Sequence, residues 1–362
     1  MSDDAFQLHV LPAGIGDALV LDYGTADAVS RVVIDGGVGK TAGPLANFLG
    51  PKPKIEMLMI THVDNDHIMG ALKMLEQRLN EPTIDDLWLN GYRHLPKSAL
   101  QSMGPVEGER LTTLIVDRGL PWNANPTFGG HAVMTSGDAS PPVATLPGGL
   151  ACTVPGRQQL IELRKKWVEV VGEANLNPAS ITPEVPLKPP GRLERLGGVD
   201  VAALAGEKSP MDNKEANGSS IAVLAAWADR TALFTGDAHA DVLIDTLNRW
   251  LGPEETLDVD VLKLPHHGSK GNVTNELMKR VKAKCYVFSS SGEGPSKHPN
   301  DQAVARVIVN STAPRILAFN HRNKRTEFWD AADLKSEHGY TTQYPNAEHG
   351  GLTIDLLHSE SQ

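Results

Sequence analysis

The segment that decides the fold is Thr61-His62-Val63-Asp64-Asn65-Asp66-His67, in which two imidazoles and three carboxylate or amide side chains crowd together. It directly follows Glu56–Thr61, an apolar run typical of a strand buried on both faces. Two carboxylates this close repel each other, and one takes up a proton unless a cation compensates them. Divalent metals bind such oxygen and nitrogen donors. The segment therefore predicts a metal site at a strand end, and a capped helix start with incidental histidines is the alternative.

Two later segments bring the same kinds of donor to strand ends. The apolar run of Leu233-Phe234-Thr235-Gly236-Asp237 ends in a carboxylate, which can bridge two metals with its two oxygens. The run Leu262-Lys263-Leu264-Pro265-His266-His267-Gly268-Ser269 ends in adjacent histidines. Each segment alone also fits an ordinary turn. Together they predict one site with these donors: His62, Asp64, Asp66, His67, Asp237 and one of the paired histidines, His266 or His267.

The paired histidines are expected to do different work. A chain that leaves a strand sends successive side chains to opposite sides. We therefore expect one of the two rings to bind metal and the other to face substrate.

In this order the three segments resemble the metallo-β-lactamase superfamily. With Asp64 at the second donor position, they are similar to the hydrolase domain of the ComEC DNA-uptake protein and its stand-alone relatives. Further similar motifs are Gly14-Ile15-Gly16-Asp17, Val33-Ile34-Asp35-Gly36-Gly37, Asn217-Gly218-Ser219-Ser220 and Lys297-His298-Pro299. The resemblance covers about 1–90 and 197–358.

The resemblance implies a role for each matching residue. The first metal takes His62, Asp64 and a bridging Asp237; the second takes Asp66, His67, Asp237 and His267. Asn217 stands where relatives have another histidine, which leaves the first metal poor in ligands. Three residues are expected to act on substrate: Asp66, His266 and His298. Asp35 is expected to orient a ligating histidine, and Ser269 to lie near the site. The implied cofactors are two divalent ions, zinc or manganese.

The order of strands and helices predicts the architecture. Two strand-rich halves, each flanked by helices, indicate an α/β (α+β) chain with sheets packed face to face. The resemblance makes this a four-layer αββα sandwich. We expect a single domain over residues 1–362, with insertions and long connections at about 91–211, where Pro and Gly are dense and one helix, Gln158–Val171, stands out.

Composition limits the partners and the compartment. The net charge of −10 gives no general attraction for nucleic acid or anionic lipid. The two cysteines, Cys152 and Cys285, cannot make a disulfide framework. The start of the chain has no signal-peptide pattern, and no apolar run is long enough for a membrane span. A cytoplasmic protein without a membrane partner is the expectation.

These features favour a metal-dependent hydrolase, with phosphodiester hydrolysis or nuclease activity first. The alternatives are a hydrolase of a small ester, lactone or phosphorylated head group, and a metal-stabilised partner or sensor module without enzymatic activity. The expected substrate is a phosphodiester, nucleic acid among the options, and His321–Arg325 is the expected phosphate contact. A homodimer and an operon-encoded protein partner both stay open.

Overall fold

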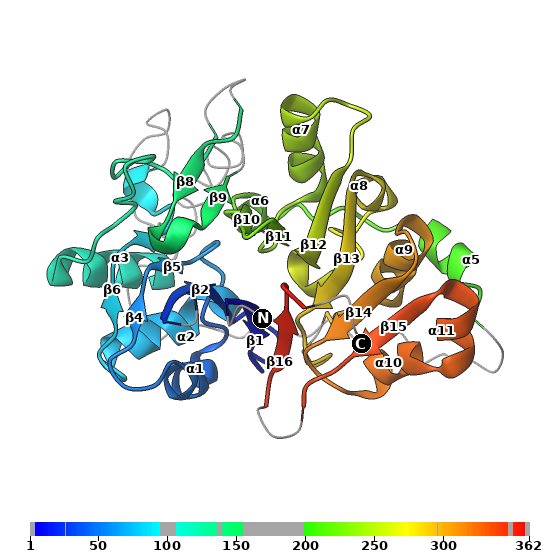
Figure 1. Ribbon diagram of the computed structural model, residues 1–362, viewed down its shortest axis with the longest axis horizontal. Helices are drawn as coiled ribbons and strands as arrows, with labels where there is room; N and C mark the ends of the chain where they lie inside the picture. The colour runs from blue at the N-terminus through cyan, green and yellow to red at the C-terminus, as the bar shows by residue number, and fades with distance from the viewer. Residues whose placement is uncertain are drawn as a thin grey trace.

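The computed structural model describes residues 4–25, 27–94, 106–135, 140–154, 199–294, 296–346 and 350–358. The N-terminal part, blue to cyan in Figure 1, forms one side of the molecule and the later part, green to orange, forms the other. The last strand, β16 (Leu352–Asp355), returns to pair with β1 (Ala5–Val10). The C-terminal strand therefore completes the sheet that the N-terminus begins.

The first sheet has the strand order β16-β1-β2-β3-β5-β7. Its other strands are β2 (Leu19–Thr25), β3 (Ala28–Ile34), β5 (Met57–Met59) and β7 (Leu87–Trp88). Pairing is antiparallel from β16 to β3 and parallel across β3, β5 and β7. A small separate sheet pairs β4 (Lys54–Ile55) with β6 (Thr83–Ile84).

The second sheet has the order β15-β14-β13-β12-β11-β10-β9-β8. Its strands are β8 (Val143–Thr145), β9 (Ala151–Thr153), β10 (Val223–Trp227), β11 (Arg230–Phe234), β12 (Leu257–Lys263), β13 (Val281–Phe288), β14 (Arg315–Phe319) and β15 (Tyr340–Gln343). The strands from β11 to β15 run parallel. Their carboxyl ends therefore meet at one edge, where ligand sites of parallel sheets commonly form.

One apolar core lies between the sheets and two lie outside them. The alternation along β1 sends Phe6, Leu8 and Val10 inward, where they join residues of the second sheet such as Val223 and Val261. The outer face of the first sheet packs on α1 (Ala42–Leu49), α2 (Asn65–Glu76) and α3 (Val106–Arg118). The outer face of the second packs on α5 (Val201–Gly206), α7 (Ala240–Trp250), α8 (Asn275–Arg280), α9 (Asp301–Asn310) and α11 (Ala332–His338). The layers are helix, sheet, sheet, helix.

This arrangement confirms the expected four-layer αββα sandwich. The single-domain boundary of 1–362 stays a prediction. The region 91–211 holds α3 and the paired strands β8 and β9, which extend the second sheet, so the described part of this region is built into the sandwich. The expected helix Gln158–Val171 lies outside the described residues. In the part of the chain that the structure describes, no helix is both long and apolar enough to cross a membrane.

Candidate metal centre

The expected donors meet at the edge where strands of both sheets end. His62, Asp64, Asp66 and His67 follow β5 and open α2. Asp237 follows β11, and His267 follows β12 in a short 3-10 turn, Pro265–Gly268. A backbone hydrogen bond from Ile221 N to Thr61 O, 2.8 Å long, joins the two sheets at this edge. The fold thereby brings together segments that lie far apart in the sequence.

Two glycines permit this close approach. A Cβ atom on Gly16 would lie 1.8 Å from the carbonyl oxygen of Asp66, so only glycine fits there. Gly236 has a φ of +50°, and a Cβ atom there would lie 2.9 Å from Thr61 Cβ. Positive φ and a missing side chain are both properties of glycine. Gly16 precedes Asp17, and Gly236 precedes Asp237. These glycines therefore let the backbone at both positions pack against the Thr61–His67 segment.

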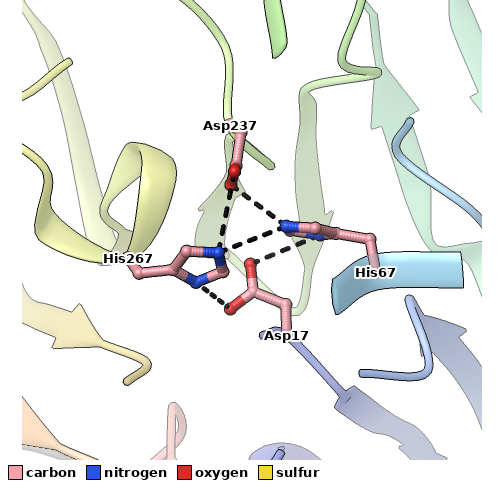
Figure 2. Close-up of side chains that lie close together, drawn as sticks. All are labelled: Asp17, His67, Asp237 and His267. Carbon is pink, nitrogen blue, oxygen red and sulfur yellow. Dashed lines mark hydrogen bonds and ion pairs between the residues drawn. The ribbon is translucent and has the colours of Figure 1, made fainter. Parts of the chain in front are cut away.

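The carboxylate of Asp237 is the centre of the cluster. Its Oδ1 lies 3.3 Å from His67 Nε2, and its Oδ2 lies 3.6 Å from His267 Nε2 and 3.9 Å from His62 Nε2. The Nε2 atoms of His67 and His267 are themselves 3.3 Å apart (Figure 2). All three rings therefore turn the same nitrogen towards one buried carboxylate.

The other nitrogen of each ring is held by a hydrogen-bond acceptor. His67 Nδ1 lies 2.7 Å from Asp35 Oδ2. The same carboxylate accepts from Thr61 Oγ1 at 2.7 Å, and Thr61 Oγ1 in turn lies 3.1 Å from His62 Nδ1. His267 Nδ1 faces the carbonyl oxygen of Ser289 at 3.0 Å. A carbonyl or carboxylate only accepts, and the Thr61 hydroxyl already donates to Asp35, so each Nδ1 carries a proton and each Nε2 is the nitrogen that can take a cation or a second proton.

Asp64 and Asp66 line the open side of the cluster. Asp64 Oδ2 is 3.8 Å from His62 Nε2, and Asp66 Oδ2 is 3.4 Å from His267 Nε2. Their side chains are 32% and 27% exposed, whereas the rings of His62 and His67 are fully buried. A substrate would therefore approach past these two carboxylates.

The electrostatics of the cluster call for positive charge. Burial by itself lowers the pKa of His67, but Asp237 and Asp35 outweigh it and raise the pKa well above its usual value. Burial also opposes protonation of His267, yet Asp237 and Asp17 raise its pKa to about 9. Burial would raise the pKa of Asp237, but the surrounding histidines hold it well below its usual range. Either protons or metal cations must balance these carboxylates.

The geometry fits metal ions. Among the described residues, the buried atoms His62 Nε2 and Asp237 Oδ1 have no hydrogen-bond partner. Two ligand atoms bound to one ion at about 2.1 Å each are about 3–4 Å apart at tetrahedral or octahedral angles. The separations around Asp237 fall in this range. His67, Asp237, His267 and Asp17 also form a buried group with donor atoms within 4.8 Å of one another.

Asp17 is a residue that the sequence-based prediction of donors did not include. Its carboxylate lies 3.2 Å from His267 Nδ1 and 4.0 Å from His67 Nδ1, on the side of the rings away from Asp237 (Figure 2). The buried ammonium of Lys263 pairs with it. Burial would raise the pKa of Asp17, but Lys263 and then His267 outweigh it and keep the carboxylate ionised. We interpret Asp17 as a support for His267, because it faces the nitrogen that does not point at the centre.

The remaining predicted residues surround the cluster at different distances. His266 Nε2 is 3.7 Å from Asp237 Oδ2, and His298 lies beside it with ring centroids 5.1 Å apart. Burial and the charge of His266 lower the pKa of His298 to about 3. Asn217 lies behind the His266 ring, with its Nδ2 3.4 Å from His266 Nδ1. Ser269 Oγ accepts from the backbone of Gly271 at 3.2 Å, so it closes a turn, and it has no described contact with the donors.

One geometric assumption of the sequence analysis does not hold. His266 and His267 do not alternate, because both have a positive φ, 49° and 55°, in place of extended backbone. Both Nε2 atoms consequently face the same oxygen of Asp237.

The expected phosphate contact at His321–Arg325 is also engaged elsewhere in part. Arg322 lies over the Tyr344 ring at 3.8 Å and pairs with Asp330 at 3.2 Å. Asn323 caps the short helix α10 (Lys324–Glu327), so this residue has a structural role in the segment.

Comparison with known proteins gives little beyond the fold. No family model matches the chain, and no curated protein matches it. Solved structures that match include the diiron β-hydroxylase CmlA from Streptomyces venezuelae, with 12% identity, a TM-score of 0.41, and coverage of 98% of this chain and 55% of that one. A mutant of the CmlA β-hydroxylase matches with 12% identity, a TM-score of 0.39, and coverage of 98% and 54%. The chain thus spans about half the length of these proteins, and scores this low do not indicate a shared activity.

The expected resemblance to the ComEC-type hydrolase domain is wrong by these comparisons. No family model or curated protein carries it, and the matching structures are of a different protein. The physical reason is that short His/Asp segments at strand ends are what metal binding at a sheet edge requires. They identify the chemistry of the edge and do not distinguish one branch of proteins from another.

Proposed function

We propose that the chain is a metal-dependent hydrolase that cleaves phosphodiesters at a two-metal site. The observation that carries the proposal is the position of Asp237. One of its oxygens faces His67, and the other faces His62 and His267. A carboxylate surrounded by several metal-binding side chains in this way can bridge two cations.

The proposed ligands divide into two groups around that carboxylate. Asp66, His67 and His267 would hold one ion, and His62 and Asp64 the other. Two bound divalent cations would supply hydroxide at neutral pH and neutralise charge on phosphoryl oxygens. Zinc and manganese suit this mixture of imidazole and carboxylate donors.

The chain's own residues would do the remaining chemistry. Asp66 is partly exposed beside His267, so its carboxylate can accept a proton from the attacking water. His298 lies beside His266 and has a buried Nδ1 without a hydrogen-bond partner among the described residues. Its ring can donate a hydrogen bond to the leaving oxygen. Asp35 keeps His67 in one orientation throughout.

The attraction for a phosphodiester substrate would have to be local. The chain carries a net charge of −10, so it has no general attraction for a polyanion. Burial would raise the pKa of Asp64, but His62 and, more weakly, the charge of the exposed Lys214 lower it, which places a positive charge near the open side of the site. Local charge at the metals and Lys214 would therefore recruit the substrate.

Turnover on a defined panel tests the proposed function. The metal-free full chain is reloaded with manganese, zinc or iron(II) and offered bis-p-nitrophenyl phosphate, a cyclic nucleotide, single-stranded DNA, duplex DNA, RNA, a phosphocholine ester and a lactone. We expect metal-dependent cleavage of a phosphodiester that the Asp237→Ala variant lacks. Cleavage of the lactone alone would identify a different hydrolase. No cleavage with any metal would support a binding or sensor module and overturn the proposal.

The cellular setting is also a proposal. Cys152 and Cys285 are free thiols buried in the core between the sheets, which suits a reducing compartment such as the cytoplasm. A homodimer or an operon-encoded partner stays a prediction. Light scattering of the full chain during size-exclusion chromatography checks the first, and co-purification with the products of neighbouring genes checks the second.

A further inference from the structure

His266 lies in an unusual backbone turn. His266 and His267 both have left-handed φ values, 49° and 55°, in the turn that follows the end of β12. A residue with a side chain is disfavoured in this backbone conformation. Strain of this kind persists where the surrounding contacts determine the conformation, and it is common at functional sites. The turn points both rings at Asp237, which an extended backbone would not do.

The position of His266 matches that of the predicted ligands. Its Nε2 atom lies 3.7 Å from Asp237 Oδ2, between the 3.6 Å of His267 and the 3.9 Å of His62. The ring is 20% exposed, so it lies at the edge of the cluster, and it faces the same Asp237 oxygen as His62 and His267. By distance alone, His266 cannot be separated from the histidines already expected to bind metal.

The Nδ1 atom of His266 has hydrogen-bond acceptors, as the Nδ1 atom of a metal-binding histidine usually does. Its Nδ1 atom lies 3.0 Å from Asp212 Oδ2 and 3.0 Å from Asn272 Oδ1. Both are acceptors, so Nδ1 carries the proton and Nε2 keeps a lone pair. Asp212 is itself held by Asn217 Nδ2 at 2.7 Å and by Asn272 Nδ2 at 3.0 Å. The Asp212–His266 pair therefore repeats the Asp35–His67 pair on the opposite side of Asp237.

This arrangement also explains Asn217. The side chain expected to be a missing histidine ligand lies on the Nδ1 side of His266, where it hydrogen-bonds Asp212. An imidazole at position 217 would lie next to Asp212 and the His266 ring, which the Asn217 side chain contacts. The site thus lacks a histidine at position 217 and has one at position 266.

We propose that His266 is the fourth ligand of the metal held by His62, Asp64 and Asp237, and that Asp212 is its positioning residue. This inference rests on the proposed two-metal site and replaces the expectation that His266 acts on substrate. It gives that metal two imidazoles and two carboxylates.

Metal binding by a matched pair of variants tests the assignment. His266→Asn removes the imidazole and keeps a residue that tolerates left-handed φ. His298→Asn makes the same replacement in the neighbouring ring. Each full-length protein is stripped of metal, titrated with Mn²⁺, and measured for bound metal after desalting and for the thermal shift on loading. We expect two ions in the wild type and in His298→Asn, and one in His266→Asn.

The outcomes separate the inference from the proposed function. Two ions bound by His266→Asn with unchanged affinity would overturn the ligand role of His266 and leave the two-metal site intact. No metal in the wild type would remove the proposed site itself. If His266→Asn does not fold, Asp212→Asn decides. The account expects the weaker Mn²⁺ site of this variant to lose about 10–100-fold in affinity, and an unchanged affinity would overturn it.

Discussion

The Nε2 atoms of His67 and His267 face each other at 3.3 Å, although the two residues are 200 positions apart in the chain. Each ring carries its proton on Nδ1, because Asp35 holds one and the carbonyl of Ser289 holds the other. The two Nε2 atoms therefore face each other beside the Asp237 carboxylate, where either a proton or a metal cation must lie between them. A cation bound by both nitrogens and by the carboxylate satisfies all three groups at once, which is why the geometry indicates a metal centre.

Replacing Asp237 by Ala should remove both metal pairing and turnover. Asp237 is the carboxylate that contacts every ring of the cluster, and without it the two cations would repel each other unscreened. The buried Cys152 lies in the core between the sheets, so Cys152→Ser serves as a control for a disturbed interior. We expect metal content measured by mass spectrometry to fall in Asp237→Ala and to stay at the wild-type level in Cys152→Ser. Wild-type turnover in Asp237→Ala would refute the bridging role.

Replacing Asp35 by Asn should weaken metal binding without removing a ligand. Asp35 holds His67 directly and His62 through Thr61, so its loss frees two rings. Removing a partner of this kind costs about 10–100-fold in metal affinity. Asp22→Asn is the control. Asp22 forms an ion pair with Arg31, with 2.6 Å between Arg31 Nε and Asp22 Oδ1, and neither residue belongs to the site. Equal metal affinity in the two variants would show that Asp35 has no orienting role.

Replacing Gly16 by Ala should disturb the site by displacing the backbone of Asp66. The added Cβ atom would overlap the carbonyl oxygen of Asp66 at 1.8 Å, so Asp66 must move. Overpacking of this kind typically costs about 1–3 kcal/mol. Gly43→Ala is the matched control, since nothing lies within 4 Å of a Cβ atom there and the residue is in helix α1. Chemical denaturation should show Gly16→Ala destabilised and Gly43→Ala unchanged or slightly stabilised.

The buried ion pair of Lys263 and Asp17 should be costly to break from one side. Removing one member of such a pair typically costs about 3–5 kcal/mol, because the other charge stays buried. Lys263→Met should therefore be strongly destabilised, and adding Asp17→Asn should restore part of the loss. Lys54→Met tests an exposed lysine, whose side chain is 60% exposed in its pair with Glu56, and should change stability by less than about 1 kcal/mol. Additive losses in the double variant would show that the pair is not coupled.

Much of the fold could be predicted from local patterns. The apolar run before His62 and the strand ends at Asp237 and His267 are short-range signals, and the structure has β5, β11 and β12 at these places. Helix α3 has its own signal, since Leu111, Leu114 and Ile115 lie one turn apart and are buried. That spacing was masked by the Pro- and Gly-rich surroundings.

The residues that hold the histidines in place could not be predicted in the same way. Asp17, Asp212 and Asn272 lie in turns and loops without a strong pattern, and only the folded chain brings them behind the histidines. The Gly-x-Gly-Asp turn that contains Asp17 was noticeable in the sequence, but nothing local connects it to His267. The left-handed conformation of His266 and His267 is likewise a tertiary effect, because neither position carries the glycine or asparagine that favours it.

The number of metal ions bound per chain tests the central claim most directly. The full-length protein is prepared without chelator, loaded with Mn²⁺ or Zn²⁺, desalted and analysed by inductively coupled plasma mass spectrometry, with its thermal stability followed in parallel. The account predicts about two ions per chain, lost on treatment with EDTA together with thermal stability, because a ligand that binds only the folded state stabilises it. A protein that retains no metal, and whose melting temperature neither metal changes, would contradict it.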